Sequence, residues 1–564
     1  MDIGIAGSGP AAESVRAAFE DTDATTTATT PADLGSHPLG VVIAPAGAQA
    51  FAVADDAATR WLAVEIGGLG GHVRSDLDAA VTVFSDGVEY RDLRDRVDSA
   101  VEGVGTDGDG DDGESPTGRR SAVRLAGAVA GHRAVSLLSG ADLAGTVVEV
   151  PGEERRLLAV PRPADRDRDL RRTHRAPSLD DALDRAERAV DDRLGLLTGV
   201  GERESFPAPY YMAVTADTTV YSDARAGSFA AGVDADWDRA FVKALGEGLE
   251  RYCAGVYRAT EFDAEAGERA VPHEAFVRPD DRSPEGVTAW VPGEDLATGD
   301  DVSLPAELVH YPPPEARYRP PITTGLGLGN GGVEALLSGL YEVVERDAAM
   351  LSWYSTYEPL GLTVDDEGFE ALVARARAES LSVSPVLVTV DVDVPVVAVA
   401  VHRDGAWPRF AVGSGADLDA TAAARSALAE ALQNWMELRA MGPEDAADEE
   451  GAIARYADFP PEARDLTAPD DGVPVASVGP ETAPTGEAEL DAVVSRVVDA
   501  GLSAYAARVT TTDVADLGFE TVRVLSPAAQ PLFVGESYFG ARAETVPREL
   551  GYEPRLDRPF HPYP

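Results

Sequence analysis

Residues 334–347 read EALLSGLYEVVERD and have the spacing of a helix that is apolar on one side. At about 100° per residue, Glu345 lies roughly 20° round this helix from Glu334, and Glu342 lies roughly 80° round. Carboxylates that share a face repel each other unless a cation neutralises them or their pKa values rise. The stretch therefore predicts a helix that presents three acids to a cation. In so acidic a chain, an ordinary solvated face is the alternative.

Two other helical segments, 245–252 and 422–439, carry acids in the same manner. Their polar residues of interest are Glu247, Glu250, Arg251, Glu430 and Gln433. Mg²⁺ prefers oxygen ligands and is usually held by one or two carboxylates together with substrate phosphates. Three acid-bearing helices therefore predict a site for magnesium and a polyphosphate.

Composition indicates a soluble protein of two or three domains with a sizeable core. The chain has 564 residues, of which 44% are hydrophobic, and a net charge of −50. Lys243 is the only lysine among 48 basic residues. An acidic chain almost without lysine suggests adaptation to molar salt, in which charges are screened within a few ångströms. We therefore expect a halophilic protein that binds neither nucleic acid nor anionic membranes.

The chain also has few features of a secreted, disulfide-bonded or membrane protein. Cys253 is the single cysteine, so there is no disulfide framework and no cysteine-based zinc site, and we expect it to be a buried structural thiol. No apolar run reaches the roughly 18 residues needed to cross a membrane, and the N-terminus lacks the regions of a signal peptide. We expect a cytoplasmic protein.

The fold class that we expect is an α+β domain preceded by a small α/β Rossmann-like domain. The expected boundaries are 1–98 for the Rossmann-like domain, 99–119 for an acidic Gly/Asp linker, 120–200 for the remainder of a candidate peptide-binding region, and 201–564 for the α+β domain. Within these, we expect one amphipathic helix over 178–198 and strands over 209–215, 219–222, 386–392 and 395–402.

The segment Gly7-x-Gly9-x-x-Ala12 follows a short strand and opens a helix, which is the context of a dinucleotide-binding loop. Residues 23–27, some twenty positions on, lack a clear acid at a strand end that would bind a ribose. A scaffold without cofactor is therefore the favoured interpretation. NAD or FAD binding, and with it a nicotinamide oxidoreductase, is the alternative.

Four features of the second half resemble the YcaO family. They are ALGEGLERY at 244–252, TGLGLGN at 324–330 running into the helix at 334–347, GSGA at 413–416 followed by ALAEALQ at 427–433, and the proline-spaced end of the chain. Their order and separation match that family over roughly residues 180–564. The resemblance implies an enzyme that uses ATP and Mg²⁺ to activate peptide backbone amides.

The resemblance also implies roles for individual residues. The metal ligands would be Glu247, Glu250, Glu334, Glu342, Glu345 and Glu430, and the ATP or phosphate ligands Arg251, Asn330, Arg346 and Gln433. Arg251 and Arg346 each follow a glutamate, so orienting that glutamate by an ion pair is the alternative to phosphate contact.

Two cationic positions of the family pattern are altered here. The glycine- and lysine-containing loop reads AGSFAAG at 226–232 without a lysine, and Ser426 stands where an arginine is expected. Lys243 lies one helical turn before Glu247 on the same face. We hypothesise that Lys243 supplies the missing charge to a phosphate; an ion pair with Glu247 is the alternative.

The N-terminal part resembles a degenerate form of the E1-like (ThiF-like) domain of SagD-type members, which form thiazoles and oxazoles. Such domains often hold zinc through cysteine pairs, but residues 160–166 contain no cysteine, so we expect no zinc. The domain is then expected to bind the peptide substrate or a leader-binding partner protein, and a homodimer is the default assembly.

The C-terminus reads PYP at 562–564 and resembles the tail that assists cyclodehydration in heterocycle-forming members. Pro562 and Pro564 are accordingly the expected catalytic residues, with a loose chain end as the alternative. The resemblance as a whole implies cyclodehydration of Cys, Ser or Thr to azolines in a ribosomally made peptide. Thioamide formation and a non-catalytic peptide-binding scaffold remain open.

Overall fold

The computed structural model describes most of the chain and divides it into two compact units. The described residues are 1–85, 87–100, 117–162, 167–176, 178–282, 289–448, 452–467 and 472–564. Unit 1 comprises residues 1–162, 188–199 and 216–221, and unit 2 comprises 163–187, 200–215 and 222–564. Most of the expected linker 99–119 lies outside the described residues.

Unit 1 is built on a seven-stranded sheet in the order β2-β1-β3-β4-β7-β8-β9. The strands are β1 Asp2–Ala6, β2 Thr25–Ala28, β3 Gly40–Pro45, β4 Trp61–Ile66, β7 Ala79–Phe84, β8 Thr146–Val150 and β9 Glu154–Arg156. The pairs β1–β2, β1–β3 and β3–β4 are parallel, and β7, β8 and β9 continue the sheet antiparallel. The parallel part, in the order β2-β1-β3-β4, has the doubly wound order 2-1-3-4.

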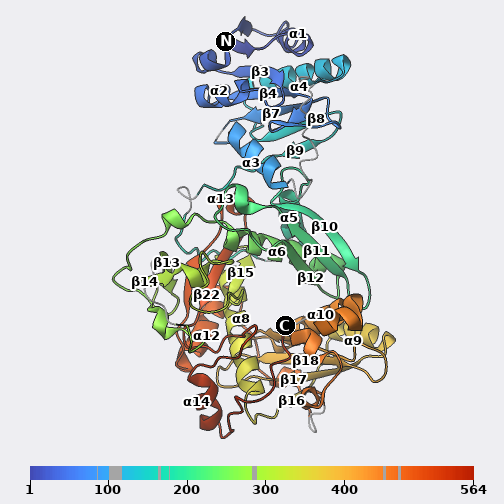
Figure 1. Cartoon of the computed structure of the whole chain (residues 1–564), viewed down its shortest axis with the longest axis vertical. Coiled ribbons are helices and arrows are strands. Elements are labelled where there is room, and N and C mark those ends of the chain that lie inside the picture. Colours follow the sequence, from blue (N-terminus) through green and yellow to red (C-terminus); the bar gives the residue numbers. More distant parts are fainter. Residues whose placement is uncertain are drawn as a thin grey trace. The chain divides into compact units, whose positions relative to one another are not determined.

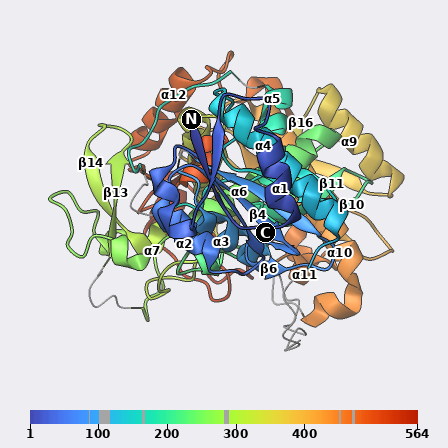
Figure 2. The same ribbon diagram turned by 90° about the horizontal axis from the view of Figure 1, so that it is seen from above.

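Helices α1 Pro10–Ala17 and α4 Arg120–Leu138 lie side by side in unit 1 (Figures 1 and 2). Their buried alanines share one apolar cluster with the sheet residues Ile3, Ile5 and Val41. The opposite face is covered by α2 Ala50–Ala57 and α3 Tyr90–Ala100, whose residues form a separate cluster around Trp61. Both faces of the sheet are thus buried, as expected for its parallel part.

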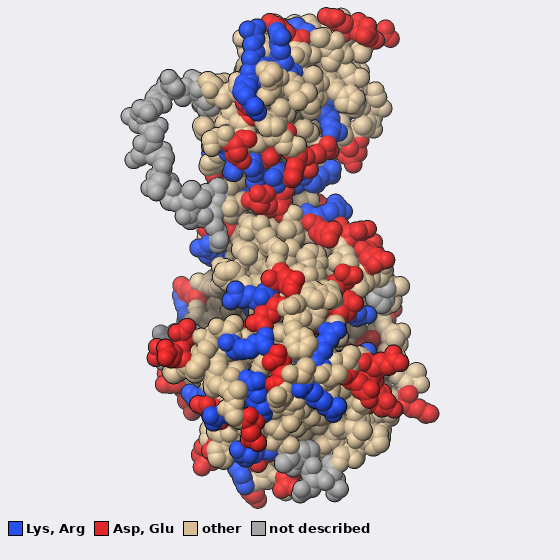
Figure 3. All heavy atoms as spheres, turned by 90° about the vertical axis from the view of Figure 1, so that its right-hand side faces the viewer, with Lys and Arg blue, Asp and Glu red and all other residues tan. Residues whose placement is uncertain are grey.

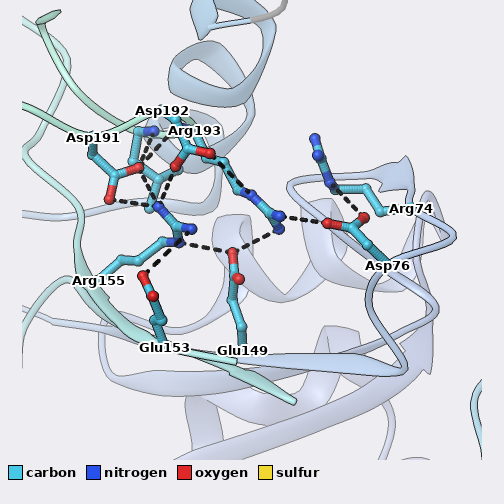
Figure 4. Close-up of polar contacts among 9 residues, drawn as sticks. Arg74, Asp76, Glu149, Glu153, Arg155, Asp191, Asp192 and Arg193 are labelled. Carbon is cyan, nitrogen blue, oxygen red and sulfur yellow. Dashed lines mark hydrogen bonds and ion pairs between the residues drawn. The ribbon is translucent and has the colours of Figure 1, made fainter. Parts of the chain in front are cut away.

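An ion-pair network ties the returning segment 188–199 to the sheet of unit 1 (Figure 4). Arg155 of β9 donates to Asp191 at 2.8 Å and to Glu149 of β8 at 2.9 Å. Arg193 donates to the same Glu149 oxygen at 2.9 Å and also contacts Asp76. Glu149 is 4% exposed, and two guanidiniums satisfy the charge that burial would otherwise disfavour.

Unit 2 contains two five-stranded sheets, in the orders β14-β13-β21-β22-β15 and β19-β18-β17-β16-β20, and a three-stranded sheet β10-β11-β12. The strands of the first sheet are β13 Trp290–Asp295, β14 Asp301–Pro305, β15 Leu326–Gly329, β21 Tyr505–Arg508 and β22 Glu520–Leu525. Those of the second are β16 Leu360–Thr363, β17 Ser382–Leu387, β18 Val396–His402, β19 Phe410–Ala416 and β20 Gly472–Pro474. The third consists of β10 Leu197–Glu204, β11 Tyr210–Thr215 and β12 Phe229–Val233.

Three long helices of unit 2, α6 Trp237–Gly255, α8 Gly332–Trp353 and α10 Ala420–Asp448, extend the three segments expected from the sequence (Figure 1). Each packs closely on a strand that precedes it in the chain. A Cβ atom on Gly232, Gly327 or Gly413 would lie 2.2, 2.3 or 2.4 Å from a backbone atom of α6, α8 or α10, respectively. These positions therefore require glycine, and the same strand-to-helix contact recurs in all three.

Three sequence-based expectations for secondary structure are corrected by the structure. The helix expected over 178–198 is α5 Leu179–Ala186, followed by a short 3-10 turn, because Val190 pairs with Leu197 in a bridge instead. The strand expected over 219–222 is a 3-10 helix over 218–220. The strand expected over 386–392 ends earlier, as β17, whereas the one over 395–402 is confirmed as β18.

The helices and the surface charge can be compared with what a membrane-spanning protein would show. Among the described helices, none is both long enough and apolar enough to cross a membrane. On the face drawn in Figure 3, acidic side chains are spread over the surface and basic ones lie among them.

Candidate functional site

The three long helices of unit 2 converge on a cavity of about 930 Å³. Its walls also include the loop 532–535 and the C-terminal residues 560, 561, 563 and 564. The charged and amide residues that line it are Glu247, Glu250, Arg251, Glu342, Glu345, Arg346, Glu430, Gln433, Asn434 and Glu437. Five of the six carboxylates that the sequence predicts as metal ligands thus face one space, together with both predicted arginines.

Backbone amides hold one carboxylate of each helix. The amide of Ala231 in β12 donates to Glu247 at 2.9 Å. The amide of Gly325, just before β15, donates to Glu342 at 2.9 Å. These two contacts, like the glycine contacts described above, bind each helix to its own strand and set the direction of the acid.

The third helix repeats the contact, because the amide of Ser414 in β19 donates to Glu430 at 2.6 Å. The hydroxyl of Ser414 also donates to Glu345 of α8 at 2.6 Å. One residue therefore fixes acids from two helices. The carboxylates are held in place before any ligand binds, which is the preorganisation that a charged ligand requires.

Arg346 lies among three of these carboxylates. Its guanidinium nitrogens are 3.6 Å from Glu345, 3.6 Å from Glu430 and 3.9 Å from Glu342. Burial disfavours the charged guanidinium, but these carboxylates outweigh it and raise the pKa of Arg346. Arg346 is thus the resident counter-ion of this part of the cavity.

Arg251 forms a closer ion pair, 2.8 Å from Glu247, one turn away on α6. It also lies over the ring of Tyr311. The alternative of an ion pair with the glutamate directly before the arginine is therefore present for Arg346 and Glu345. Arg251 pairs with Glu247 of the preceding turn and not with Glu250, the residue directly before it.

Burial strongly affects the ionisation of the acids. It raises the pKa of Glu250 to about 8 and that of Glu345 to about 7, against the opposing effect of the neighbouring Arg251 and Arg346. Burial also raises the pKa of Glu430, which Arg346 and the Ser414 amide partly oppose. Near neutral pH, Glu250 therefore holds a proton and Glu345 is partly protonated, and a bound cation would displace these protons.

A family model described as YcaO cyclodehydratase, ATP- and Mg²⁺-binding, matches residues 231–530, which include all three helices of the cavity. The chain belongs to the YcaO family. The resemblance expected from the sequence is confirmed. That description also accounts for a cavity in which oxygen donors and arginines meet.

Solved YcaO heterocyclases share the fold of this YcaO protein. A "Heterocyclase in complex with substrate and Cofactor" is 19% identical, with a TM-score of 0.70, over 98% of this chain and 83% of that chain. The heterocyclase TruD is 17% identical, with a TM-score of 0.65, over 98% of this chain and 82% of that one. The expected fold class, a YcaO domain preceded by a sheet domain, is confirmed.

A relative known by sequence is an uncharacterized protein of Methanothermobacter thermautotrophicus. It is 34% identical over 128 residues, which are 22% of this chain and 33% of that protein. The match thus spans about a third of the curated relative's length.

The donor set fits magnesium that binds together with phosphate oxygens. Among the described residues, no three histidine, cysteine or acidic side chains lie close enough to hold a metal ion by themselves. Mg²⁺ commonly takes one or two carboxylates and fills its remaining positions with phosphate oxygens and water. Glu342, Glu345 and Glu430 are best placed to provide such carboxylates, because they surround a resident positive charge.

Glu334 and Asn330 lie outside the cavity lining. Although Glu334 shares a helical face with Glu345, eleven residues separate them by about 16 Å along the axis. Glu334 is exposed and accepts a hydrogen bond from the backbone amide of Asn330 at 2.9 Å. The side-chain oxygen Oδ1 of Asn330 accepts a hydrogen bond from Arg185 of α5. Their roles as magnesium and ATP ligands stay predictions of the resemblance.

Lys243 also lies outside the lining, and the alternative given for it, an ion pair with Glu247, is wrong. Its Nζ is 2.6 Å from Asp234 and donates to the Val233 carbonyl at 3.2 Å, because the side chain extends toward the end of β12. Glu247 forms its ion pair with Arg251 instead. Contact between Lys243 and a phosphate stays a prediction.

The C-terminal tail is anchored and is not a loose end. Trp353 donates to the Pro559 carbonyl at 2.9 Å, and the two ring nitrogens of His561 face the carbonyls of Phe533 and Tyr563 at 2.9 and 3.1 Å. Burial lowers the pKa of His561 to about 4, so the ring is neutral at physiological pH. These contacts bring Pro564 to the cavity wall, whereas Pro562 is buried behind it.

Sequence analysis missed several residues of the site. Glu437 and Tyr210 were not considered, although Glu437 continues the spacing of Glu430 and Gln433 on the same face of α10. That spacing was a usable signal. The hydroxyl of Ser414 and the ring of His561 carried no such signal, because their contacts join residues that lie far apart in the chain.

Proposed function

We propose that this YcaO protein is an ATP-dependent cyclodehydratase that converts Cys, Ser or Thr residues of a ribosomally made peptide to azolines. The observation that carries the proposal is the convergence of five carboxylates, two arginines and the chain's proline tail on one cavity of about 930 Å³. The family description as ATP- and Mg²⁺-binding supports the nucleotide part.

The proposed reaction has three bond-forming steps. The side-chain thiol or hydroxyl of the substrate attacks the carbon of the preceding amide and loses its proton. The amide oxygen then takes the γ-phosphoryl group of ATP and leaves as phosphate. The amide nitrogen gives up its proton as the C=N bond of the ring forms, so one water is removed overall and appears in the products of ATP cleavage.

The residues of the cavity would position the phosphates and stabilise their charge. Magnesium, when bound, would neutralise phosphate oxygens and polarise the transferred group. Arg346 and Arg251 are the cations available to the phosphates, and Glu342, Glu345 and Glu430 would hold the metal. No nucleophile of the protein is required, in agreement with the complete burial of Cys253.

The C-terminal tail supports azoline formation in particular. Tyr563 and Pro564 line the same cavity as the acids, so the tail lies beside the proposed site of phosphoryl transfer. Pro564, backed by the buried Pro562, would contact the peptide at the reacting amide. We propose a peptide as the substrate, delivered with or without a leader-binding partner, and a cytoplasmic homodimer as the working form.

The first test is calorimetric titration of Mg·ATP into the full chain in molar KCl. We expect micromolar binding by the wild type and at least a tenfold loss in Glu345→Gln, which keeps the side-chain shape but removes one of the carboxylates that would hold the metal. Glu370→Gln, at an exposed position of α9 Glu367–Ala378, is the matched control. Lys243→Gln in the same series tests its predicted phosphate contact.

Two results would contradict the proposal. A folded wild type that binds no Mg·ATP would favour a non-catalytic peptide-binding scaffold. Turnover that requires added sulfide, and yields a product heavier by the exchange of oxygen for sulfur, would indicate a thioamide-forming enzyme.

A further inference from the structure

A second cavity of about 410 Å³ adjoins the first. The two share the side chains of Glu247 and Glu437. The other lining residues of the second cavity include Tyr210, Met212, Phe229, Met436 and Met441. They come from the sheet β10-β11-β12 and from α10, so this cavity has a firm frame of strands and helix.

The walls of the second cavity are largely apolar and adaptable. Met212, Met436 and Met441 surround it, and the ring of Phe229 is 63% exposed beside them. Methionine and aromatic side chains suit the faces of a planar ring system. The volume lies within the range of small-ligand sites.

Glu437 stands between the two cavities and is held from one side only. The hydroxyl of Tyr210 and the amide of Gln433 both donate to its Oε1, at 2.9 and 3.0 Å. Burial and the Glu437 charge raise the pKa of Tyr210, so its hydroxyl remains a donor. Among the described residues, none donates a hydrogen bond to the other oxygen, Oε2. A fixed carboxylate thus keeps one acceptor for a ligand.

We propose that Glu437 is a specificity-determining residue that accepts a hydrogen bond from a ribose hydroxyl of the nucleotide. This inference rests on the proposed function, because it places the phosphates in the first cavity and the base in the second. The sugar then crosses the boundary at Glu437. A site built to pair a hydroxyl rejects the analogue that lacks it, because the carboxylate oxygen is then left without its hydrogen-bond donor.

The experiment compares Mg·ATP with its 2′-deoxy and 3′-deoxy analogues by calorimetry on the full chain. For the wild type, we expect at least one deoxy analogue to bind roughly ten- to a hundredfold more weakly than ATP, the effect of one hydrogen bond to a charged group. Glu437→Gln should weaken ATP binding. It should also bring the affinity for ATP close to the affinity for the deoxy analogue that the wild type binds more weakly. Glu444→Gln, on the exposed end of α10, should behave as the wild type.

A second variant distinguishes a loss of the proposed contact from a general folding defect. Tyr210→Phe keeps the packing but removes one of the two donors that fix Glu437, so we expect a partial loss of discrimination. Rotation of the freed carboxylate would reduce, but not abolish, its contact with the sugar. The wild-type comparison of nucleotides does not depend on any variant.

The outcomes separate this inference from the proposed function. Binding of ATP and both deoxy analogues with equal affinity would overturn the role of Glu437 but leave ATP binding established. Failure to bind any of them would overturn the proposed function and the inference with it. If Glu437→Gln changed the KM for peptide and left nucleotide discrimination intact, the second cavity would be a peptide site, and the inference would be wrong.

Discussion

Glu250 shows that burial in the cavity disfavours an ionised carboxylate when no cation is bound. It faces the cavity from α6, and burial raises its pKa to about 8 although Arg251 is the next residue. The folded protein therefore keeps a proton on Glu250 that the unfolded chain releases near its ordinary pKa of 4.5. Between these two values, folding takes up a proton, so this group lowers stability as the pH rises through the window.

We predict that Glu250→Gln removes part of the pH dependence of unfolding. The melting temperature should fall from pH 5.5 to pH 8.5, and this fall should be larger for the wild type than for the variant, because the amide of the variant cannot ionise. Mg·ATP should raise the wild-type value most at the higher pH, where the carboxylate is free to bind a cation. Identical pH profiles for wild type and variant, with Glu370→Gln as control, would contradict the assigned pKa.

At the same scale, spacing on single helices predicted most of the cavity. Glu247, Glu342 and Glu430 could be chosen from periodicity and resemblance because each lies on an apolar helix at a matching position. Glu334 shows the limit, since helical angle ignores the rise along the axis. The partners of Lys243 were equally out of reach, because its contact with Asp234 depends on where β12 ends.

Among the elements, the C-terminal tail is the segment whose placement says most about chemistry. Cation–π contact places Arg558 over the ring of Trp353 at 3.8 Å, and the same arginine pairs with Asp465 at 2.8 Å. Downstream of this anchor, His561 and Tyr563 are buried at 1% and 0% exposure. The tail is thus part of the cavity wall and holds a defined conformation.

We predict that deletion of residues 562–564 abolishes azoline formation while Mg·ATP affinity changes less than tenfold. The anchor at Trp353 lies upstream of the cut and should survive, so the acids of the helices stay in place. Mass spectrometry of the peptide product and calorimetry of the nucleotide measure the two effects. Full turnover by the truncated protein would refute the role of Pro562 and Pro564.

Elements with strong periodicity were predictable, and those set by tertiary pairing were not. Helices α6, α8 and α10 lie where the apolar spacing placed them, and each is longer than expected. The segment 178–198 has a helical pattern throughout, yet the chain leaves the helix after Ala186 because residues 190 and 197 pair. Such pairing overrides local propensity and has no local signal.

For the whole molecule, net charge is the property that can be calculated directly from the composition. A charge of −50 on 564 residues repels itself in dilute buffer. The repulsion is screened over roughly 10 Å at 0.1 M salt and roughly 3 Å at 1 M. The fold class was predictable at this scale, since strand and helix order indicated a sheet unit followed by the larger α+β unit.

We predict that the melting temperature rises by several degrees between roughly 0.1 M and 2 M KCl, as screening weakens the repulsion among surface carboxylates. Sucrose of equal osmolality is the control, because it stabilises proteins without screening charge. Equal stabilisation by the two solutes, or a melting temperature indifferent to KCl, would argue against halophilic adaptation.

The isolation of Lys243 has a practical consequence. Its ammonium is half-exposed on α6, one turn before Glu247, while Cys253 near the end of the same helix is buried. Amine-reactive dyes therefore have one side chain to attack in the whole chain, apart from the terminal amine, and thiol dyes have none at the surface. A fluorophore coupled there would lie one helical turn from Glu247, which lines the cavity, so the native protein already carries an attachment point for testing the proposed nucleotide binding.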